Sequence, residues 1–489
     1  RYIMNKISCF LPYAGKEQVE KTVNSLQATG LIEEIRLITT DATLESLPDC
    51  EILFVDMPYS SATLKAIANA AKGEYTLLYT KETTLEMGMF ALERMIHILE
   101  DSSAGMVYAD HYQIADGKQS NAPVIDYQFG SLRDDFNFGS LLLFNTEKLK
   151  EAAGHMKSDY NFAGLYDLRL KLSQHSDLVH INEYLYSEVE NDTRKSGEKI
   201  FDYVDPKNRD RQIEMEQACT EHLKEIGGYL APEFKKIEFS AGNFEYEASV
   251  IIPVRNRIRT IRDAIKSVLM QKTDFKYNLI IIDNHSTDGT TEAIDEFKDD
   301  ERVIHIIPER NDLGIGGCWN VGVHHPKCGK FAVQLDSDDV YKDENTLAIM
   351  VRAFYEQNCA MVVGTYMMTD FNMNMIAPGI IDHKEWTPAN GRNNALRING
   401  LGAPRAFYTP VLREVKVPNT SYGEDYALGL NFSRQYQIGR VYDVVYLCRR
   451  WDDNSDASLD IVKMNGHNLY KDRIRTWELQ ARIAMNKNK

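Results

Sequence analysis

The sequence has few cysteines and no closely spaced pair of them. Its seven cysteines are odd in number and scattered, at Cys9, Cys50, Cys219, Cys318, Cys328, Cys359 and Cys448. Because zinc-binding and redox cysteines come in short-range pairs, this scatter predicts neither a zinc site nor a disulfide framework. We therefore expect a protein of the reducing cytoplasm.

Long apolar runs and a surplus of basic residues are also missing. No stretch approaches the ~18 continuous apolar residues of a membrane-spanning helix. The formal net charge is −16, so repulsion from phosphate argues against nucleic acid as the main partner. A single nucleotide held through a metal ion remains compatible with this charge.

The chain is long, and its two halves resemble each other. Its 489 residues exceed one ordinary core, so two or three domains are expected. Gly73–Glu82 resembles Gly329–Asp338, and Tyr166–Leu170 aligns with Glu424–Leu428 at nearly the same offset. We predict a first domain at 4–230, a linker at 231–247 and a second domain at 248–489 with a C-terminal helix.

The halves differ where carboxylates are expected. Thr80–Glu82 stands where Asp336–Asp338 stands, and the first half has no counterpart of Asp283–Gly289. A lysine between ligand positions brings its own positive charge and disfavours a divalent cation. The first domain is therefore predicted to be degenerate and non-catalytic.

Three carboxylates follow an apolar run in the second half. Phe331–Leu335 has the pattern of a buried strand, and Asp336, Asp338 and Asp339 come directly after it. Clustered carboxylates repel one another and need a cation or strong donors. Oxygen ligands of this kind suit Mg²⁺ or Mn²⁺ bound with substrate phosphates. The alternative is an acidic turn that caps the helix expected near Glu344.

Two more features of the second half point to a nucleotide. The strands expected at Ser249–Pro253 and Asn278–Ile282 imply a parallel unit with its ligand at the carboxyl ends, where Asp283 lies. The glycine-rich segment Arg310–Gly322 permits close backbone approach to phosphate, but it is neither a Rossmann fingerprint nor a P-loop. The alternatives are a helix cap at Asp283 and plain flexibility of the glycine segment.

Taken in order, these motifs resemble the family 2 glycosyltransferases, which have the GT-A nucleotide-sugar fold. The resemblance covers residues 249–455. It rests on Ser249–Pro253, Ile281–Thr290, Asn311–Gly322, Leu335–Asp339 and Gly423–Asp425. Together with the repeat, it implies an α/β protein of two tandem GT-A-like domains, Rossmann-like with mostly parallel sheets.

The resemblance also implies roles for single residues. Asp338 would bind Mn²⁺ or Mg²⁺ directly in a DXD motif, and Asp336 would contact the ion or the ribose. Asp425 would be the general base, with Glu424 beside it on an acceptor hydroxyl. The predicted nucleotide-sugar contacts are Pro253, Arg255, Asp283, Asn284, Asn311, Gly314, Asn320, Asp336 and Trp451.

At two places the sequence departs from the family pattern, and there the resemblance does not assign residue roles. Relatives often place a histidine in a loop after the base, where this chain has Arg449–Ser455, so Asp452 or Asp453 is a candidate third metal ligand. Arg449 and Arg450 could pair with phosphates, and Trp451 could stack on a sugar. The pair Asn284-His285 leaves the identity of the base, uridine or guanosine, open.

We predict inverting, metal-dependent transfer from a nucleotide-sugar, favouring a UDP-sugar, to a glycan or lipid-linked acceptor in polysaccharide or glycoconjugate biosynthesis. Displacement of a diphosphate by a sugar hydroxyl requires a metal ion at the leaving diphosphate and one base at the attacking hydroxyl. The rivals are a sugar-phosphate nucleotidyltransferase and a non-catalytic carbohydrate-binding or assembly protein. Peripheral membrane contact and a homodimer are compatible with the sequence.

Overall fold

The structure is a computed structural model that describes residues 6–45, 47–189, 208–385, 387–451, 454 and 459–488. It divides into two compact units. The first comprises Arg1–Lys195, Ile213–Ile226 and Leu459–Asp472, and the second comprises Ser196–Gln212, Gly227–Ser458 and Arg473–Lys489. The predicted bounds 4–230 and 248–489 stay a prediction.

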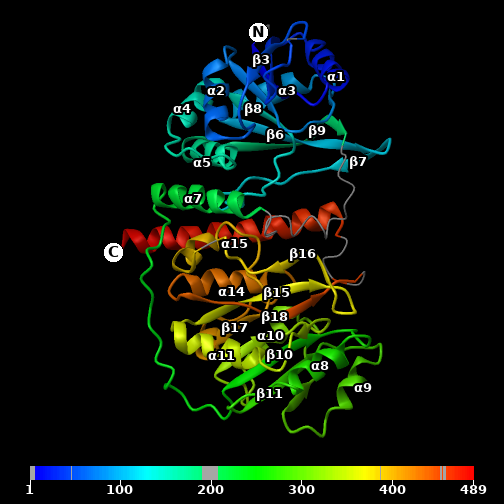
Figure 1. Ribbon diagram of the computed structural model, residues 1–489, viewed down its shortest axis with the longest axis vertical. Coiled ribbons are helices and arrows are strands. Elements are labelled where there is room, and N and C mark those ends of the chain that lie inside the picture. Colours follow the sequence, from blue (N-terminus) through cyan, green and yellow to red (C-terminus); the bar gives the residue numbers. More distant parts are fainter. Residues whose placement is uncertain are drawn as a thin grey trace. The chain divides into compact units, whose positions relative to one another are not determined.

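The first unit is built on one mixed sheet in the order β3-β2-β1-β4-β8-β6-β9-β5, with β7 beside β6 (Figure 1). Its strands are β1 (Ile7–Pro12), β2 (Ile32–Thr39), β3 (Glu51–Phe54), β4 (Tyr75–Tyr79), β5 (Leu85–Met87), β6 (Met106–Ala115), β7 (Lys118–Ala122), β8 (Leu141–Asn145) and β9 (Leu178–Val189). Its helices are α1 (Lys16–Gln27), α2 (Ser61–Ala70), α3 (Ala91–Asp101), α4 (Thr146–Gly154), α5 (Gly164–His175) and, from Ile213 onward, α7 (Arg209–Glu225).

Two hydrophobic clusters form the core of this unit, one on each face of the sheet. Cys9 of β1 points into a cluster with α1 and α3, and the next residue, Phe10, points into a cluster with α2, α4 and α5. This alternation follows from the two-residue period of a strand. Because both faces are covered, the central strands are apolar throughout.

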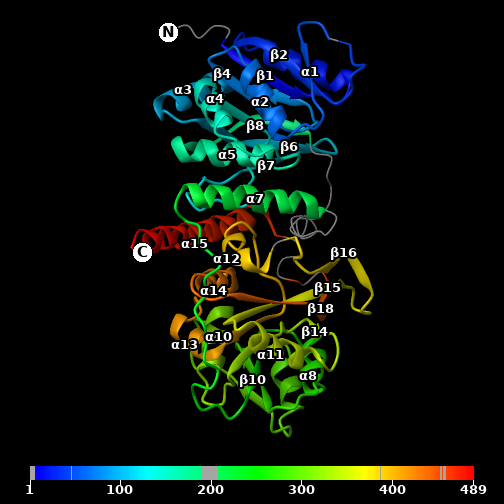
Figure 2. The same cartoon turned by 60° about the vertical axis from the view of Figure 1, so that its left-hand side comes forward.

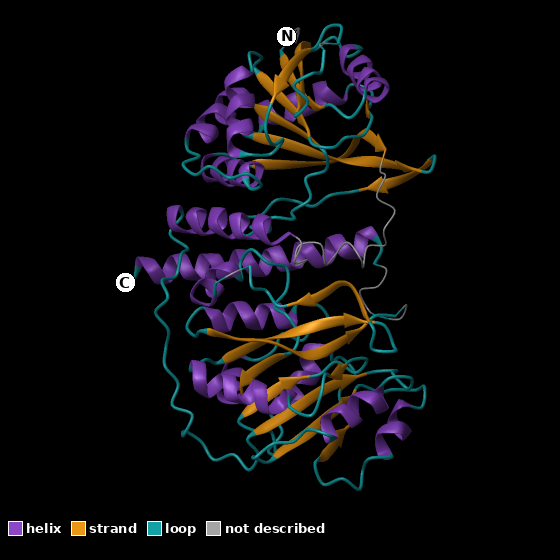
Figure 3. Cartoon of the chain, viewed as in Figure 1, coloured by secondary structure: helices purple, strands orange, loops and turns teal. Residues whose placement is uncertain are grey.

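The second unit repeats this architecture with the order β12-β11-β10-β13-β17-β15-β18-β14, and β16 beside β15 (Figures 1 and 3). Its strands are β10 (Ala248–Val254), β11 (Tyr277–Asp283), β12 (Val303–Ile306), β13 (Phe331–Gln334), β14 (Val340–Tyr341), β15 (Met361–Thr369), β16 (Met375–Ile381), β17 (Arg405–Tyr408) and β18 (Ile438–Arg449). The prediction of two tandem α/β domains with mostly parallel, Rossmann-like sheets is confirmed.

Helices of the second unit surround its sheet (Figure 2). They are α8 (Ile261–Leu269), α9 (Thr290–Asp295), α10 (Ile315–Val323), α11 (Thr346–Gln357), the 3-10 turn η3 (Pro388–Asn390), α12 (Gly391–Asn394), α13 (Thr409–Val415), α14 (Glu424–Ser433) and α15 (Ile461–Lys487). α15 is the long C-terminal helix expected from the sequence, and it supplies residues to both units, through Asp472 to the first and from Arg473 to the second. Over the described part of the chain, no helix combines the length and apolarity needed to cross a membrane.

Candidate active site

The parallel strands of the second unit bring the predicted site residues to one edge of the sheet. β10, β11 and β13 pair in parallel, so their carboxyl ends lie at the same edge. Asp283 is the last residue of β11, and Asp336 comes two residues after β13 ends. β17 runs antiparallel to β13, so its first residue, Arg405, also lies at this edge.

Asp336 and Asp338 are held there by neighbouring side chains. Asp338 Oδ2 accepts a hydrogen bond from Asn454 Nδ2 at 3.1 Å and another from Trp451 Nε1 at 3.4 Å. Asp336 Oδ1 accepts one from Gln334 Nε2 at 2.9 Å. Asp338 is partly exposed and Asp336 is exposed, so a ligand can reach both carboxylates. Hydrogen bonds of this kind orient metal-binding carboxylates.

Asp339 and Arg449 fix the turn that carries Asp338. Asp339 is 4% exposed and accepts hydrogen bonds from Tyr446 Oη at 2.7 Å and from the backbone amide of Arg449 at 2.8 Å. The Arg449 Nε donates to the carbonyl of Asp338 at 2.7 Å, and its Nη1 pairs with Asp263 at 2.8 Å. The structure therefore shows Arg449 as a buried support of the carboxylate turn. Burial and the neighbouring carboxylates raise the pKa of Asp339 well above its usual range.

Glu424 and Asp425 begin helix α14 at the same edge. Asp425 Oδ2 forms an ion pair with Arg405 Nη1 at 3.0 Å. The backbone amide of Arg405 donates to Gln334 Oε1 at 3.1 Å, and Gln334 in turn holds Asp336. Arg405 and Gln334 thus connect the predicted base to the predicted metal-binding aspartates. The sequence carried no signal for Arg405, which is one arginine at the start of a short strand.

In the described part of the chain, the pKa shifts of two carboxyl groups indicate crowded negative charge in this cluster. Burial, followed by the charge of Asp425, raises the pKa of Glu424 to about 8. The surrounding protein desolvates Asp336 and raises its pKa; Asp338 and Asp425 add to the rise, whereas Arg405 opposes it. Asp336 is nonetheless exposed, so solvent offsets part of this desolvation. A divalent cation would supply the missing positive charge.

The donor set at Asp336 and Asp338 fits Mn²⁺ or Mg²⁺, because both ions prefer oxygen ligands and often use only one or two carboxylates with substrate oxygens. Among the described residues, no group of three or more His, Cys, Asp or Glu side chains forms a complete metal cage. Asp452 and Asp453, the predicted candidates for a third ligand, lie outside the described residues.

Asp283 is buried, and its carboxylate is occupied by protein donors. Its oxygens accept hydrogen bonds from the Ser286 amide at 3.0 Å, Thr291 Oγ1 at 2.5 Å and His305 Nε2 at 3.3 Å. Burial alone would raise the pKa of Asp283, but hydrogen bonds from His305, Thr291 and Ser286 outweigh burial and hold it well below the usual range. Asn284 donates to a backbone carbonyl at 2.8 Å. Asp283 thus holds the turn before α9 and does not cap that helix, whose N-cap is Gly289 without a side-chain hydrogen bond. Nucleotide contact by both residues stays a prediction.

The glycine-rich segment packs against the loop that precedes α14. The Gly314 amide donates to Asn419 Oδ1 at 2.8 Å, and the Gly316 amide donates to the Thr420 carbonyl at 2.9 Å. A Cβ at Gly316 would lie 1.8 Å from the Pro418 oxygen, so only glycine fits there. These amides, which the sequence suggested for phosphate, have protein partners. Contact of Gly314 with the nucleotide stays a prediction.

The remaining residues predicted to contact the nucleotide differ in whether protein groups already bind their side chains. Both polar groups of the Asn320 side chain bond to the backbone of Val417, at 2.7 and 2.9 Å. Pro253 lies in β10 opposite Ile282, whereas Arg255 and Asn311 are exposed in loops after β10 and β12. Arg255 and Asn311 are therefore the more accessible of these candidates.

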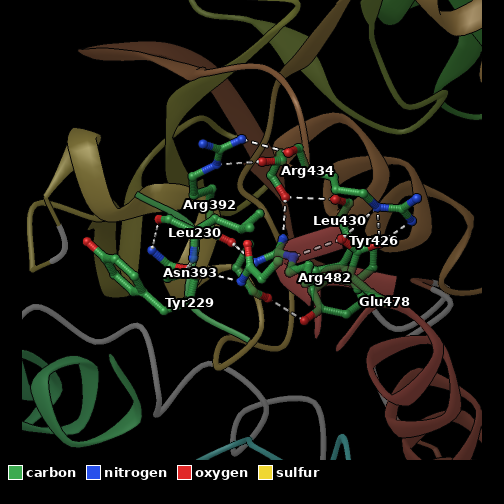
Figure 4. A network of polar contacts seen from close by, with 12 residues as sticks. Tyr229, Leu230, Arg392, Asn393, Tyr426, Leu430, Arg434, Glu478 and Arg482 are labelled. Atoms are coloured by element: carbon green, nitrogen blue, oxygen red, sulfur yellow. Dashed lines mark hydrogen bonds and ion pairs between the residues drawn. The ribbon is translucent and has the colours of Figure 1, made fainter. Parts of the chain in front are cut away.

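Helix α14 is supported from behind by the last part of α15 (Figure 4). Arg475 Nε donates to Tyr426 Oη at 2.8 Å, and its guanidinium lies 4.6 Å from the Tyr426 ring centroid. Glu478 pairs with Arg434 at 2.6 Å and with Arg482 at 2.8 Å. Because Tyr426 follows Asp425 directly, these buried contacts set the position of the predicted base.

Part of the second unit is similar to known glycosyltransferases. Residues 249–406 match the model of the family described as Glycosyl transferase family 2. An uncharacterized glycosyltransferase of Rickettsia felis is 37% identical over 198 residues, which are 40% of this chain and 31% of the relative. The GalNAc(5)-diNAcBac-PP-undecaprenol beta-1,3-glucosyltransferase of Campylobacter jejuni is 36% identical over 93 residues, 19% of this chain and 29% of the relative.

A solved structure with a similar chain trace is S. aureus TarS 1-349 in complex with UDP-GlcNAc. It is 18% identical, covers 48% of this chain and 72% of its own, and has a TM-score of 0.37. The matches with the first three curated relatives cover 31%, 17% and 40% of the length of those proteins.

Proposed function

We propose that the second half of the chain transfers a sugar from a nucleotide-sugar donor to an acceptor hydroxyl. The premise is that this half carries a family 2 glycosyltransferase domain. The observation that carries the proposal is the convergence of Asp336, Asp338 and the Arg405–Asp425 pair at the carboxyl edge of one sheet. A cation site next to a candidate base is what displacement of a diphosphate requires.

Asp338 and Asp336 would hold a divalent metal ion, Mn²⁺ or Mg²⁺. When bound, such an ion stabilises the negative charge that develops on a departing diphosphate. Asn454 and Trp451 already occupy Asp338 Oδ2, which leaves Oδ1 of that carboxylate for the ion. These two side chains limit the rotation of Asp338.

Asp425 would act as the general base. As the acceptor oxygen bonds to the anomeric carbon, the bond from that carbon to the diphosphate breaks and its electron pair leaves with the diphosphate. The hydroxyl proton passes to the Asp425 carboxylate, which Arg405 orients through their 3.0 Å contact. One displacement of this kind inverts the anomeric configuration.

Glu424 has a different task from Asp425. With a pKa raised to about 8, it is mostly protonated at neutral pH and therefore donates a hydrogen bond instead of accepting a proton. Its Oε2 is buried and has no hydrogen-bond partner among the described residues. A sugar hydroxyl on the acceptor would satisfy this oxygen.

We propose a glycan or lipid-linked acceptor, which the name of the Campylobacter relative supports, and a UDP-sugar as the first donor to test. A role in polysaccharide or glycoconjugate biosynthesis follows from these substrates. We propose the first unit as a non-catalytic partner domain. The cytoplasmic location, peripheral membrane contact and homodimer stay predictions.

The test is Mn²⁺-dependent release of nucleotide from a panel of UDP- and GDP-sugars by the full chain. Asp338→Ala should lower the rate by about 10³-fold, because it removes a direct ligand of the metal. The matched variant Glu82→Ala in the first unit should leave it unchanged. Undiminished release by Asp338→Ala would reject the assignment, and release of pyrophosphate from nucleoside triphosphate and sugar phosphate would show a nucleotidyltransferase instead.

A further inference from the structure

Arg259 lies beside the metal-binding turn, in the loop between β10 and α8. The next residue, Thr260, is fully buried and its Oγ1 donates to the carbonyl of Ser337 at 2.9 Å. Ser337 stands between the two aspartates proposed to bind the metal. This bond places the loop of Arg259 directly against the Asp336–Asp338 turn.

The Arg259 guanidinium lies over two adjoining aromatic rings. It lies 4.8 Å from the centroid of Phe371, which follows β15, and 5.1 Å from that of Trp451, which follows β18. The rings are 5.3 Å apart and nearly perpendicular. Because Trp451 Nε1 also contacts Asp338 Oδ2 at 3.4 Å, a single side chain separates the guanidinium from the proposed metal ligand.

This cation has no anionic partner among the described residues. Arg259 is exposed, and among the described residues its guanidinium contacts the two rings and donates no hydrogen bond that would occupy its N–H groups. On Phe371 a second guanidinium, that of Arg449, lies 4.8 Å away. Arg449 is 1% exposed, and its Nη2 is buried without a hydrogen-bond partner among the described residues.

We propose that Arg259 binds a phosphate group of the substrate next to Asp338. This inference rests on the proposed function. A planar guanidinium whose N–H groups have no acceptor among the described residues matches phosphate oxygens, and charge-assisted hydrogen bonds of this type are among the stronger ones. A phosphate there would meet Arg259 on one side and the metal-binding carboxylates, through their ion, on the other.

Two substrates could carry this phosphate: the nucleotide-sugar, through its diphosphate, and a phosphate-bearing acceptor. The first source makes Arg259 a further stabiliser of the leaving group. The second makes Arg259 a determinant of acceptor choice. Both sources use the same contact, so the experiment has one arm for each.

The first arm measures binding of UDP and UMP, or of GDP and GMP, to the full chain in Mn²⁺ by calorimetry. If the donor supplies the phosphate, Arg259→Met weakens binding of the diphosphate about tenfold and leaves the monophosphate unchanged. Arg259→Lys, which keeps the charge without the planar fork, should show an intermediate loss. A purely structural role would weaken both nucleotides together.

The second arm measures KM for a phosphate-bearing and a phosphate-free acceptor. If the acceptor supplies the phosphate, Arg259→Met raises KM for the first about tenfold, leaves the second unchanged and does not alter nucleotide binding. Arg262→Met is the matched control, because Arg262 lies on the same segment and is already paired with Glu296 at 2.5 Å.

Unchanged diphosphate binding together with unchanged KM in Arg259→Met overturns the inference and leaves the proposed function standing. If the wild-type chain binds no nucleoside diphosphate, both the inference about Arg259 and the proposed function are overturned. If Arg259→Met does not fold, Phe371→Leu provides the second variant, because it removes one of the two rings that fix the guanidinium. It should shift the same quantity in the same direction, by a smaller factor.

Discussion

The two units share a strand order but not a chemistry. In the second, Ile282 pairs with Pro253 and the next residue is Asp283; in the first, Ile38 pairs with Pro12 and the next residue is Thr39. Asp336 follows β13 at the place where Thr80 follows β4. The sheet of the first unit therefore forms without acidic residues at these two positions.

The first unit closes the same edge with an internal ion pair. Lys81 Nζ lies 2.7 Å from Glu188 Oε1, and His111 Nε2 lies 3.3 Å from the same oxygen. Although burial would raise its pKa, contacts with His111 and Lys81 lower the pKa of Glu188 to about 2. Glu188 is thus a neutralised carboxylate, unlike the under-compensated cluster of the second unit.

The corresponding helices also begin differently. α5 starts at Gly164 and α14 starts at Glu424, each three residues after an exposed polar residue, Asn161 or Ser421. By helix position, Gly164 and the residue after it stand where Glu424 and Asp425 stand. The alignment that paired Asp167 with Asp425 was wrong by two positions, because it followed a shared Asp instead of the helix start.

The comparison predicts its largest effect at the base. Asp425→Asn should lower kcat by about 10²–10⁴-fold, because it removes the proton acceptor. Asp167→Asn in the first unit should leave transfer unchanged. Single-turnover rates with saturating donor would measure both, and a large loss in Asp167→Asn would show that the first unit takes part in the chemistry.

Arg405 should have the next largest effect. Arg405→Met should lower kcat about 10–100-fold, because it leaves Asp425 and Asp336 without their cation. Arg405 opposes the rise in the pKa of Asp336, so its removal should raise the carboxyl pKa values. The proposed transfer depends on deprotonated carboxylates, so as the pH falls the variant should lose activity at a higher pH than the wild type. A pH profile of kcat/KM with an unmoved acidic limb would contradict this.

A smaller effect is expected behind α14. Arg475→Met should lower kcat up to about tenfold, because it frees Tyr426, which adjoins the base. The control lies on the same helix: Asp472→Asn removes the contacts of Asp472 with Ser131 and Arg133 in the first unit and should leave kcat unchanged. Equal losses in both variants would assign the effect to the helix as a whole.

The smallest effect is expected at the ion pair of the first unit. Lys81→Ala should destabilise this unit by about 1–2 kcal/mol, because Lys81 is 38% exposed and solvent screens the pair. Since the folded pKa of Glu188 is lowered, its contribution is present above the unfolded pKa and is lost as pH falls toward about 2. Hydrogen exchange of β9 amides would measure this, with transfer activity unchanged. Once the intrinsic pH dependence of amide exchange is corrected for, unchanged protection of β9 in Lys81→Ala at neutral pH would contradict it.

The sequence predicted the strands well because their apolar runs are continuous. β11 is a buried strand that ends in Asp283, and β13 is a buried strand with Asp336 two residues after its end, as expected. The sequence did not reveal Arg405 or Asn454, because their partners Asp425 and Asp338 come together only through tertiary packing.

Other residues matched a motif for reasons that the motif does not distinguish. The amide of Asn320 bonds to backbone, and the glycines at 314 and 316 admit a neighbouring loop. A sequence does not distinguish an asparagine that binds a loop from one that binds a nucleotide. The two differ only in their hydrogen-bond partners, which are set by the folded chain.

The tight seam between the glycine segment and the loop before α14 has an evolutionary consequence. Because Gly316 packs against Pro418 and Gly314 bonds to Asn419, the segment proposed to face the donor and the helix that carries the proposed base are mechanically coupled. A mutation that reshapes the first displaces the second and costs turnover. New substrate preferences should therefore arise most easily at positions outside this seam, where side chains can change while the proposed base stays in place.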